Sequence, residues 1–217
     1  MAPRKRTGQK LLRFDRALGG RLVAGADEAG RGPLAGPLVV AGVLLDYACL
    51  RDHRVRPLAL LNDSKQVDAT TREELYRAVL ACAERVAIRV FPAAVIDREG
   101  LHRCNLRGLR EVLRACGPAD VSLVDGFRLG PAAPPHRAVV DGDCKSAAIA
   151  AASIVAKVTR DRYMQTADAL YPGYGFASHV GYITPSHTRI VRERGPCEIH
   201  RRSWRARAYA AAEEDAA

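Results

Sequence analysis

Two apolar runs separated by a turn rich in glycine and proline constrain the fold of this chain most. Residues 21–27 (RLVAGAD) and 38–46 (LVVAGVLLD) consist mainly of valine, leucine and alanine, as in strands that are covered on both faces. The segment GRGPLAGP between them contains three glycines and two prolines, which do not continue regular structure. We therefore predict two buried strands joined by a turn, an order that allows antiparallel pairing.

The remaining periodicity alternates between helix and strand. Apolar spacing predicts three further strands and three helices. The strands are expected at residues 86–91, 121–125 and 137–141, and the helices near residues 70–82, 105–116 and 145–169. This order favours an α/β protein with a mixed five-stranded sheet flanked by helices.

The ends of the chain differ from its centre in composition. Residues 1–20 are basic and are expected to form a loosely held entry segment, followed by the main domain at residues 21–170. Residues 171–210 are rich in glycine, tyrosine, histidine and arginine, which predicts a small helical extension of short helices and loops. Residues 211–217 (AAEEDAA) are expected to be a frayed, disordered tail.

The charge balance indicates a polyanionic partner. The 217 residues include 34 basic and 24 acidic side chains, which gives a net charge of +10. Nucleic acid is the partner that such a charge favours, although an arginine-rich genome would produce the same bias. Six cysteines without a CxxC pair predict free thiols in a reducing compartment rather than a zinc site.

Targeting signals are not evident, and we expect a cytoplasmic protein with no membrane association. The basic start MAPRKRTGQK is not followed by the apolar stretch of a signal peptide. The longest apolar runs fall short of the ~20 residues that span a bilayer.

Four carboxylates follow the predicted strands. Asp27 and Glu28 close the first strand, Asp125 closes another, and Asp143 comes just after a third. Strand ends of such a sheet converge on one edge, and clustered carboxylates repel each other unless a cation binds. Oxygen ligands suit Mg²⁺ or Mn²⁺, and two such ions could hold the attacking and leaving oxygens of a phosphodiester. The alternative is that each acid only caps a turn.

Backbone geometry limits which of these carboxylates can face the same metal site. Because neighbouring residues of a strand point to opposite faces, Asp27 and Glu28 can share a site only if the strand breaks near the glycines at 30 and 32. By the same period of two, Asp141 and Asp143 share one face, so either could be the fourth ligand.

The turn Gly30-Arg31-Gly32 can present bare backbone groups to a ligand at close range. It has neither the spacing of a dinucleotide-binding loop nor that of a P-loop. A backbone cradle beside the acids would suit a sugar 2′-OH, which distinguishes RNA from DNA. An ordinary tight hairpin is the alternative.

Several longer motifs resemble ribonuclease HII, the type 2 ribonuclease H family. They occur in the family's order and span residues 21–204. The motifs are DEAGRGPLAGP (27–37), LNDSK (61–65), LVDG (123–126), GDCKSAAIAAASIVAKVTRDR (142–162), YGFASHVGYITPSH (174–187) and GPCEIHRRSW (195–204).

The resemblance implies an RNase H-like fold and a metal-dependent endoribonuclease. Such an enzyme would cleave the RNA strand of RNA–DNA hybrids and incise duplex DNA on the 5′ side of embedded ribonucleotides, as in ribonucleotide excision repair. The products would carry a 3′-OH and a 5′-phosphate. Two divalent ions, Mn²⁺ or Mg²⁺, would serve the hydrolysis, and the protein would act as a monomer.

The resemblance also assigns roles to individual residues. The catalytic and metal-binding acids fall on Asp27, Glu28, Asp125 and Asp143, with alignment favouring Asp143 over Asp141. The turn at Gly30, Arg31 and Gly32 would read the 2′-OH, and Tyr182 would sense the RNA–DNA junction. Further substrate contacts fall on Lys65, Lys145, Thr184, His187 and Arg202.

Three positions depart from the family pattern. Asp141 replaces a residue that is usually basic, Val180 stands where a lysine is common, and Trp204 replaces the usual phenylalanine. The valine removes one possible phosphate contact, whereas the tryptophan keeps an aromatic ring.

Other functions stay open at this stage. Tyr182 and His187 could be half-buried groups with satisfied hydrogen bonds, and the C-terminal arginines could form a solvated basic face. A nucleic-acid-binding protein without activity would be expected to lack the four acids, yet all are present. A metal-dependent nuclease for DNA is harder to separate, because carboxylate–metal chemistry does not itself select the sugar.

Overall fold

The computed structural model describes residues 7–50, 58–62, 64 and 67–204. The chain forms two compact units, each assembled from three stretches. The first unit comprises residues 1–29, 40–89 and 106–158, and the second comprises residues 30–39, 90–105 and 159–217.

A five-stranded sheet in the order β3-β2-β1-β4-β5 is the framework of the protein. Its strands are β1 (Leu22–Ala29), β2 (Leu38–Asp46), β3 (Arg85–Phe91), β4 (Val121–Asp125) and β5 (Arg137–Val139). β4 runs parallel to both β1 and β5, with Gly25 opposite Leu123 and Asp125 opposite Val139.

The other strand pairs run antiparallel, which makes the sheet mixed. The N–H of Tyr47, just after β2, donates to the carbonyl of Arg21, just before β1, at 2.8 Å. The Arg21 guanidinium also forms a 2.7 Å ion pair with Asp46 at the end of β2. On the other side of β2, the N–H of Glu84, just before β3, donates to the carbonyl of Leu44. The predicted α/β fold with a mixed sheet is therefore confirmed.

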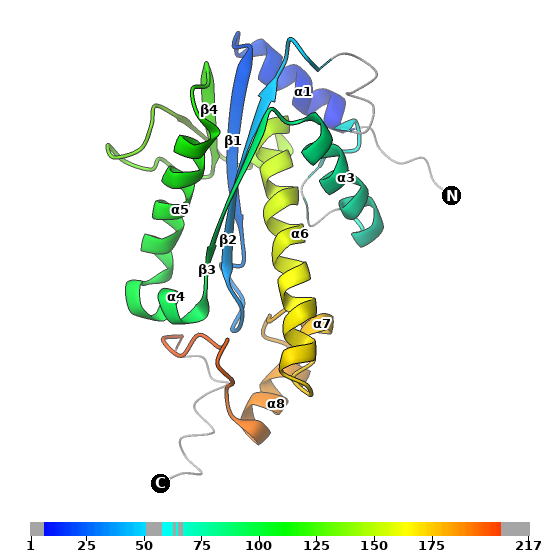
Figure 1. Cartoon of the computed structure of the whole chain (residues 1–217), viewed down its shortest axis with the longest axis vertical. Helices are drawn as coiled ribbons and strands as arrows, with labels where there is room; N and C mark the ends of the chain where they lie inside the picture. Colours follow the sequence, from blue (N-terminus) through cyan, green and yellow to red (C-terminus); the bar gives the residue numbers. More distant parts are fainter. Residues whose placement is uncertain (1–6, 51–57, 63, 65–66, 205–217) are drawn as a thin grey trace. The chain divides into compact units, whose positions relative to one another are not determined.

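Seven α-helices and one 3₁₀ helix have described bounds. They are α1 (Gly8–Ala17), α3 (Ala69–Cys82), α4 (Ala93–Glu99), α5 (Leu101–Cys116), the 3₁₀ helix η1 (Gly142–Cys144), α6 (Ala147–Leu170), α7 (Phe176–His179) and α8 (Pro185–Arg194) (Figure 1).

Helices cover both faces of the sheet within the first unit, where α5 and α6 lie on opposite sides of the strands (Figure 1). A Cβ atom added to Gly25 of β1 would come within 2.1 Å of the Ala148 backbone, so only glycine permits this close approach of α6. On β2, Gly42 faces Val112 and Cys116 of α5. The strand residues between these layers are almost completely buried.

The start of the chain is more ordered than its composition indicates. Residues 8–17, expected to be loosely held, form helix α1 and bury Leu11, Leu12 and Asp15. The Asp15 carboxylate accepts hydrogen bonds from the Tyr47 hydroxyl at 2.8 Å and from the Ala148 N–H at 2.9 Å. Asp15 thereby satisfies an N–H in the first turn of α6 that has no partner within the helix. The basic composition of residues 1–20 does not indicate this contact.

Most predicted elements are found, with differences at their ends. The strands at 38–46 and 121–125 have the predicted bounds, and the first strand continues to Ala29. The strand predicted at 137–141 ends at Val139, because Asp141 takes a left-handed conformation and η1 follows. Helix α4 was missed, since its seven residues are too few to show a helical period.

The C-terminal segment contains the short helices α7 and α8, as predicted. The tail at 211–217 lies outside the described residues. Among the helices that the structure describes, none is both long and apolar enough to cross a membrane.

Candidate active site

Asp27 and Glu28 lie near the end of β1, in the first unit. β1 runs unbroken to Ala29, and the chain turns only at Gly30. Asp27 is 6% exposed, and its carboxylate accepts the N–H of Glu28 at 2.7 Å. The strand does not break before Glu28, yet the charge of Glu28 acts on Asp27 and raises its pKa.

Asp125 ends β4, the strand next to β1. Its Oδ1 atom accepts the N–H of Gly142 at 2.7 Å, which fixes the start of η1 beside this carboxylate. A Cβ atom on Gly142 would lie 2.5 Å from Cδ1 of Ile149 and 3.1 Å from the same Oδ1 atom, so a larger residue would have to displace both side chains.

Asp141 and Asp143 do not share a strand face, which corrects the argument from a period of two. Asp141 has φ 52° and is exposed, whereas Asp143 is a half-buried residue of η1. The hydrogen bond from Gly142 to Asp125 places the start of η1 next to the β4 carboxylate. Asp143 as the fourth acid stays a prediction.

The charge of Asp27 is unfavourable in the folded protein. Burial raises the pKa of Asp27 well above its ordinary value, and the charges of Glu28 and Asp125 raise it further. A hydrogen bond from Ser153 of α6 acts in the opposite direction. The interaction with both acids indicates that Asp27, Glu28 and Asp125 lie near one another.

A divalent cation would relieve this repulsion, and the donor set fits one. Carboxylate oxygens are the ligands that Mg²⁺ and Mn²⁺ prefer. In the described part of the chain, no three His, Cys, Asp or Glu side chains form a group that could already hold a metal ion. The fit therefore depends on the donor chemistry and on the raised pKa of Asp27, whose charged form a cation would stabilise.

The glycine turn belongs to the second unit and is held by two buried arginines. Gly30 has φ +98°, and a Cβ atom there would lie 2.4 Å from the Arg160 guanidinium. Arg201 donates to the carbonyls of Gly30 at 2.6 Å and Gly36 at 2.9 Å. Because its carbonyls are engaged inward, the turn has a fixed shape, while Arg31 and Gly32 are exposed.

Arg160 connects this turn to the segment that carries Tyr182. Its guanidinium donates to the carbonyls of Ala35 and Pro37, and also to that of Val180, at 2.9–3.0 Å. The Arg160 guanidinium carbon lies 5.8 Å from the centre of the Tyr182 ring. A Cβ atom on Gly32 would be 3.7 Å from Cε1 of Tyr182, so the structure brings Tyr182 next to the glycine turn.

The other predicted substrate contacts differ in their surroundings. Thr184 caps α8 by accepting the N–H of His187 at 3.1 Å. His187 is 0% exposed, and both of its ring nitrogens contact groups within the protein.

Arg202 is exposed and its backbone N–H donates to Asp97. Lys145, in the first unit, is exposed and donates to the Val140 carbonyl, and Lys65 lies outside the described residues.

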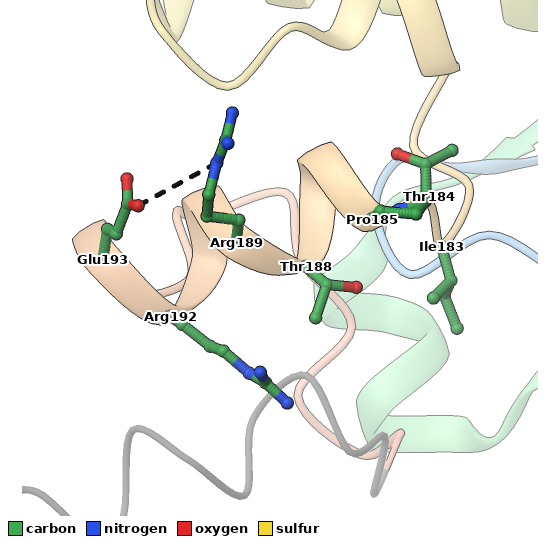
Figure 2. Close-up of a pocket in the computed structure, with 7 residues that line it drawn as sticks. All are labelled: Ile183, Thr184, Pro185, Thr188, Arg189, Arg192 and Glu193. Atoms are coloured by element: carbon green, nitrogen blue, oxygen red, sulfur yellow. Dashed lines mark ion pairs between the residues drawn. The ribbon is translucent and has the colours of Figure 1, made fainter.

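A surface depression runs along α8 and the two residues before it. Figure 2 shows its lining residues, with the Arg192 side chain directed away from the Arg189–Glu193 ion pair. Thr184 therefore lies in a hollow that is also lined by two arginines and one glutamate. The lining residues are Ile183, Thr184, Pro185, Thr188, Arg189, Arg192 and Glu193.

Three residues that shape the site were not singled out from the sequence. Ser153, in the alanine-rich first half of α6, forms a side-chain hydrogen bond with Asp27. Arg160 and Arg201 lie inside the quoted motifs without an assigned contact. Arg201, one of the C-terminal arginines considered as a solvated basic face, is instead completely buried. A buried arginine and a surface arginine cannot be distinguished by residue type alone. For Arg160, the apolar helix residues before it were the only sequence signal that indicated burial.

Comparisons with known proteins agree with these features. A sequence model described as Ribonuclease HII matches residues 24–207. A Ribonuclease HII of Nocardia farcinica is 47% identical over 208 residues, which cover 94% of this chain and 80% of the relative.

Solved structures give the same result. Ribonuclease H2 from Pyrococcus horikoshii superposes with a TM-score of 0.74 and 26% identity, covering 89% of this chain and 98% of that one. Bst-RNase HIII, solved in complex with Mn²⁺, has the same fold, with a TM-score of 0.67, 19% identity, and coverage of 99% and 74%. The chain therefore belongs to the ribonuclease HII family and is a ribonuclease H, a hydrolase of a family that cuts the RNA of RNA–DNA hybrids.

Proposed function

We propose that this enzyme cleaves the RNA strand of RNA–DNA hybrids and also incises duplex DNA on the 5′ side of single embedded ribonucleotides, leaving a 3′-OH and a 5′-phosphate. The observation that carries the proposal is the buried Asp27 carboxylate beside Glu28 and Asp125. Like charges close together destabilise the folded protein unless a cation binds to them. The match to the ribonuclease HII family supports a role for such a cation in the hydrolysis of a phosphodiester.

Asp27, Glu28, Asp125 and Asp143 would hold Mg²⁺ or Mn²⁺. The bound cations would lower the pKa of the attacking water and neutralise charge that develops on the attacking and leaving oxygens. The chain's own part is to keep these acids in place. Asp125 is fixed by the Gly142 N–H, and Asp27 by the Glu28 N–H and Ser153.

Selection of RNA would depend on the glycine turn and Tyr182. Exposed Gly32 has no side chain, so its backbone is accessible to a sugar hydroxyl, and the 41% exposed Tyr182 ring lies beside it. A ring in that place can stack against a nucleotide, while a backbone N–H or carbonyl bonds the 2′-OH. Arg160 and Arg201 keep the turn in this shape.

Phosphate contacts would come from exposed cationic groups and from one half-buried hydroxyl group. Lys145, Thr184 and Arg202 are the described candidates, and Arg31 belongs to the turn itself. With a net charge of +10, binding is expected to weaken steeply as salt rises, because neutralised phosphates release counterions.

Three matched duplexes test the proposal. One is an RNA–DNA hybrid, the second is a DNA duplex with one ribonucleotide, and the third is the same duplex in all-DNA form. Each is incubated with Mg²⁺, with Mn²⁺ and with chelator, and the ends of the products are identified. We expect metal-dependent cutting of the first two only. Equal cutting of the all-DNA duplex would instead indicate a general nuclease.

A further inference from the structure

Three buried histidines lie beneath the segment that carries Tyr182. His179, His187 and His200 are at most 8% exposed. The rings of His179 and His187 stack with centroids 4.1 Å apart, and Phe176 contacts all three rings. Phe176 is completely buried, so these imidazoles belong to the packed interior of the second unit.

Backbone partners determine which nitrogen of each ring carries the proton. The N–H of Cys197 donates to Nδ1 of His200 at 3.0 Å, so this nitrogen is an acceptor and the proton is on Nε2. That Nε2–H donates to Nε2 of His187 at 3.1 Å. His187 must then carry its proton on Nδ1, which donates to the Tyr182 carbonyl at 2.8 Å.

The result is a hydrogen-bonded relay with a single direction, from the Cys197 N–H through His200 and His187 to the Tyr182 carbonyl. A carbonyl oxygen can only accept, and a backbone N–H can only donate, so both ends are fixed. Reversing the relay would leave the Cys197 N–H and the Tyr182 carbonyl without these partners.

His179 holds the other side of the same peptide segment. The N–H of Tyr182 donates to the His179 carbonyl at 2.9 Å, and the N–H of Gly181 donates to Nδ1 of His179 at 3.1 Å. Both polar backbone groups of Tyr182 are therefore held by histidines, although its ring is exposed. Fixing the backbone restricts the positions that the exposed ring can take.

We propose that His187 is a positioning residue that holds Tyr182 beside the glycine turn, and that it does not itself contact the nucleic acid. This inference rests on the proposed role of Tyr182 in recognising a ribonucleotide. The complete burial of His187, and the use of both ring nitrogens within the protein, leave it no surface from which to reach a phosphate. A preorganised ring avoids the entropy loss of ordering it upon binding.

Two polar substitutions of His187 test the hydrogen bonds of its Nδ1 and Nε2 atoms separately. In His187→Asn, the amide nitrogen takes the approximate place of Nδ1 and can still donate to the Tyr182 carbonyl, while the link to His200 is lost. In His187→Gln, the longer side chain can reach His200 but no longer places a donor at the Nδ1 position. His102→Asn, at an exposed position of α5, is the matched control.

The readout is the ratio of kcat/KM on the single-ribonucleotide duplex to kcat/KM on the long hybrid, with thermal unfolding followed for each variant. Because the Tyr182 carbonyl loses its hydrogen bond to the side chain at position 187, we expect His187→Gln to lower this ratio about tenfold, mainly through kcat. His187→Asn and His102→Asn should keep it within about threefold.

The outcomes discriminate between positioning and general stability. An unchanged ratio in a folded His187→Gln would overturn the proposal, and so would an equal loss in His187→Asn. If His187→Gln does not fold, a His187→Asn enzyme with a wild-type ratio supports positioning, and one with a low ratio refutes it. Failure of the wild-type enzyme to cut the single-ribonucleotide duplex would refute the proposed function instead, before any variant is compared.

Discussion

The Nη2 atom of Arg201 lies 2.6 Å from the carbonyl oxygen of Gly30, across 171 positions of sequence. The same guanidinium donates to the carbonyl of Gly36, so one buried cation joins both ends of the glycine turn. The turn that would read a 2′-OH is therefore built by a residue near the far end of the described chain.

Arg201→Lys should destabilise the protein and impair ribonucleotide recognition. A single ammonium group cannot satisfy the carbonyls that the planar guanidinium reaches, and unsatisfied buried carbonyls cost about 2–3 kcal/mol in the free energy of unfolding. Urea unfolding measures this loss. Arg189→Lys, whose side chain is 73% exposed, is the control and should change the stability little.

Asp27→Asn should stabilise the metal-free protein while abolishing cleavage. Because burial and two neighbouring carboxylates raise the pKa of Asp27, this carboxyl lowers the stability of the fold at pH values above its ordinary pKa, and the loss is complete above the raised pKa. The amide carries no charge and removes this loss. We expect the Tm without metal to rise by several degrees. Mn²⁺ should raise the Tm of the wild type but much less that of the variant, and a lower Tm for the variant would contradict this explanation.

Asp125→Asn should keep the fold and lose activity. The amide oxygen can still accept the Gly142 N–H, so the start of η1 is retained, while the anionic ligand is gone. Cleavage of the hybrid with Mg²⁺ should fall by about three orders of magnitude. Near-normal rates would remove Asp125 from the metal site.

Tyr182→Ala should reduce incision at single ribonucleotides more than cleavage of long hybrids. A long hybrid offers many ribonucleotides and contacts, whereas a single one depends on the ring beside Gly32. Rates on both duplexes are compared with those of Tyr182→Phe, which keeps the ring. Equal losses on the two substrates would exclude a sensing role.

The second unit should become less stable in mild acid. Burial and the neighbouring His187 lower the pKa of His200 from 6.5 to about 4, with smaller effects from His179 and Arg202 and an opposing one from the Cys197 backbone. Between pH 6.5 and 4 the unfolded chain binds a proton that the folded chain does not, so stability is full above pH 6.5 and falls as the pH decreases.

The expected loss from this one group is about 3 kcal/mol, since each pKa unit corresponds to about 1.4 kcal/mol. Urea unfolding at several pH values measures it. His200→Leu should flatten the pH dependence in this range, although His187, whose pKa is also lowered, contributes to the remaining slope. An unchanged slope would show that His200 is not the group responsible.

The local residue pattern predicted those strands, helices and turns that depend on residues close to one another in the sequence. Valine and leucine runs predicted β2 and β4 with their observed bounds, and helical spacing predicted α3, α5 and α6. The turn after β1 was predicted from its glycines and prolines. These features were accessible because strand and helix periods repeat within a few residues.

Tertiary contacts decided the rest. Helix α1 is held through Asp15, which bonds a residue 133 positions away. Arg160, Arg201 and the histidine relay are likewise defined by partners that are distant in sequence, and a buried arginine or histidine has no local signature.

By itself, the sequence determined the five strands, the helices α3, α5 and α6, the glycine turn and the carboxylates at strand ends, together with the family to which the chain belongs. Only the tertiary structure decided that Asp27 is buried beside like charges, that two arginines hold the turn, and that His187 supports Tyr182 from the interior. The physical reason is that desolvation and hydrogen-bond partnership depend on what the folded chain places around a group, whereas periodicity depends only on the residues next to it.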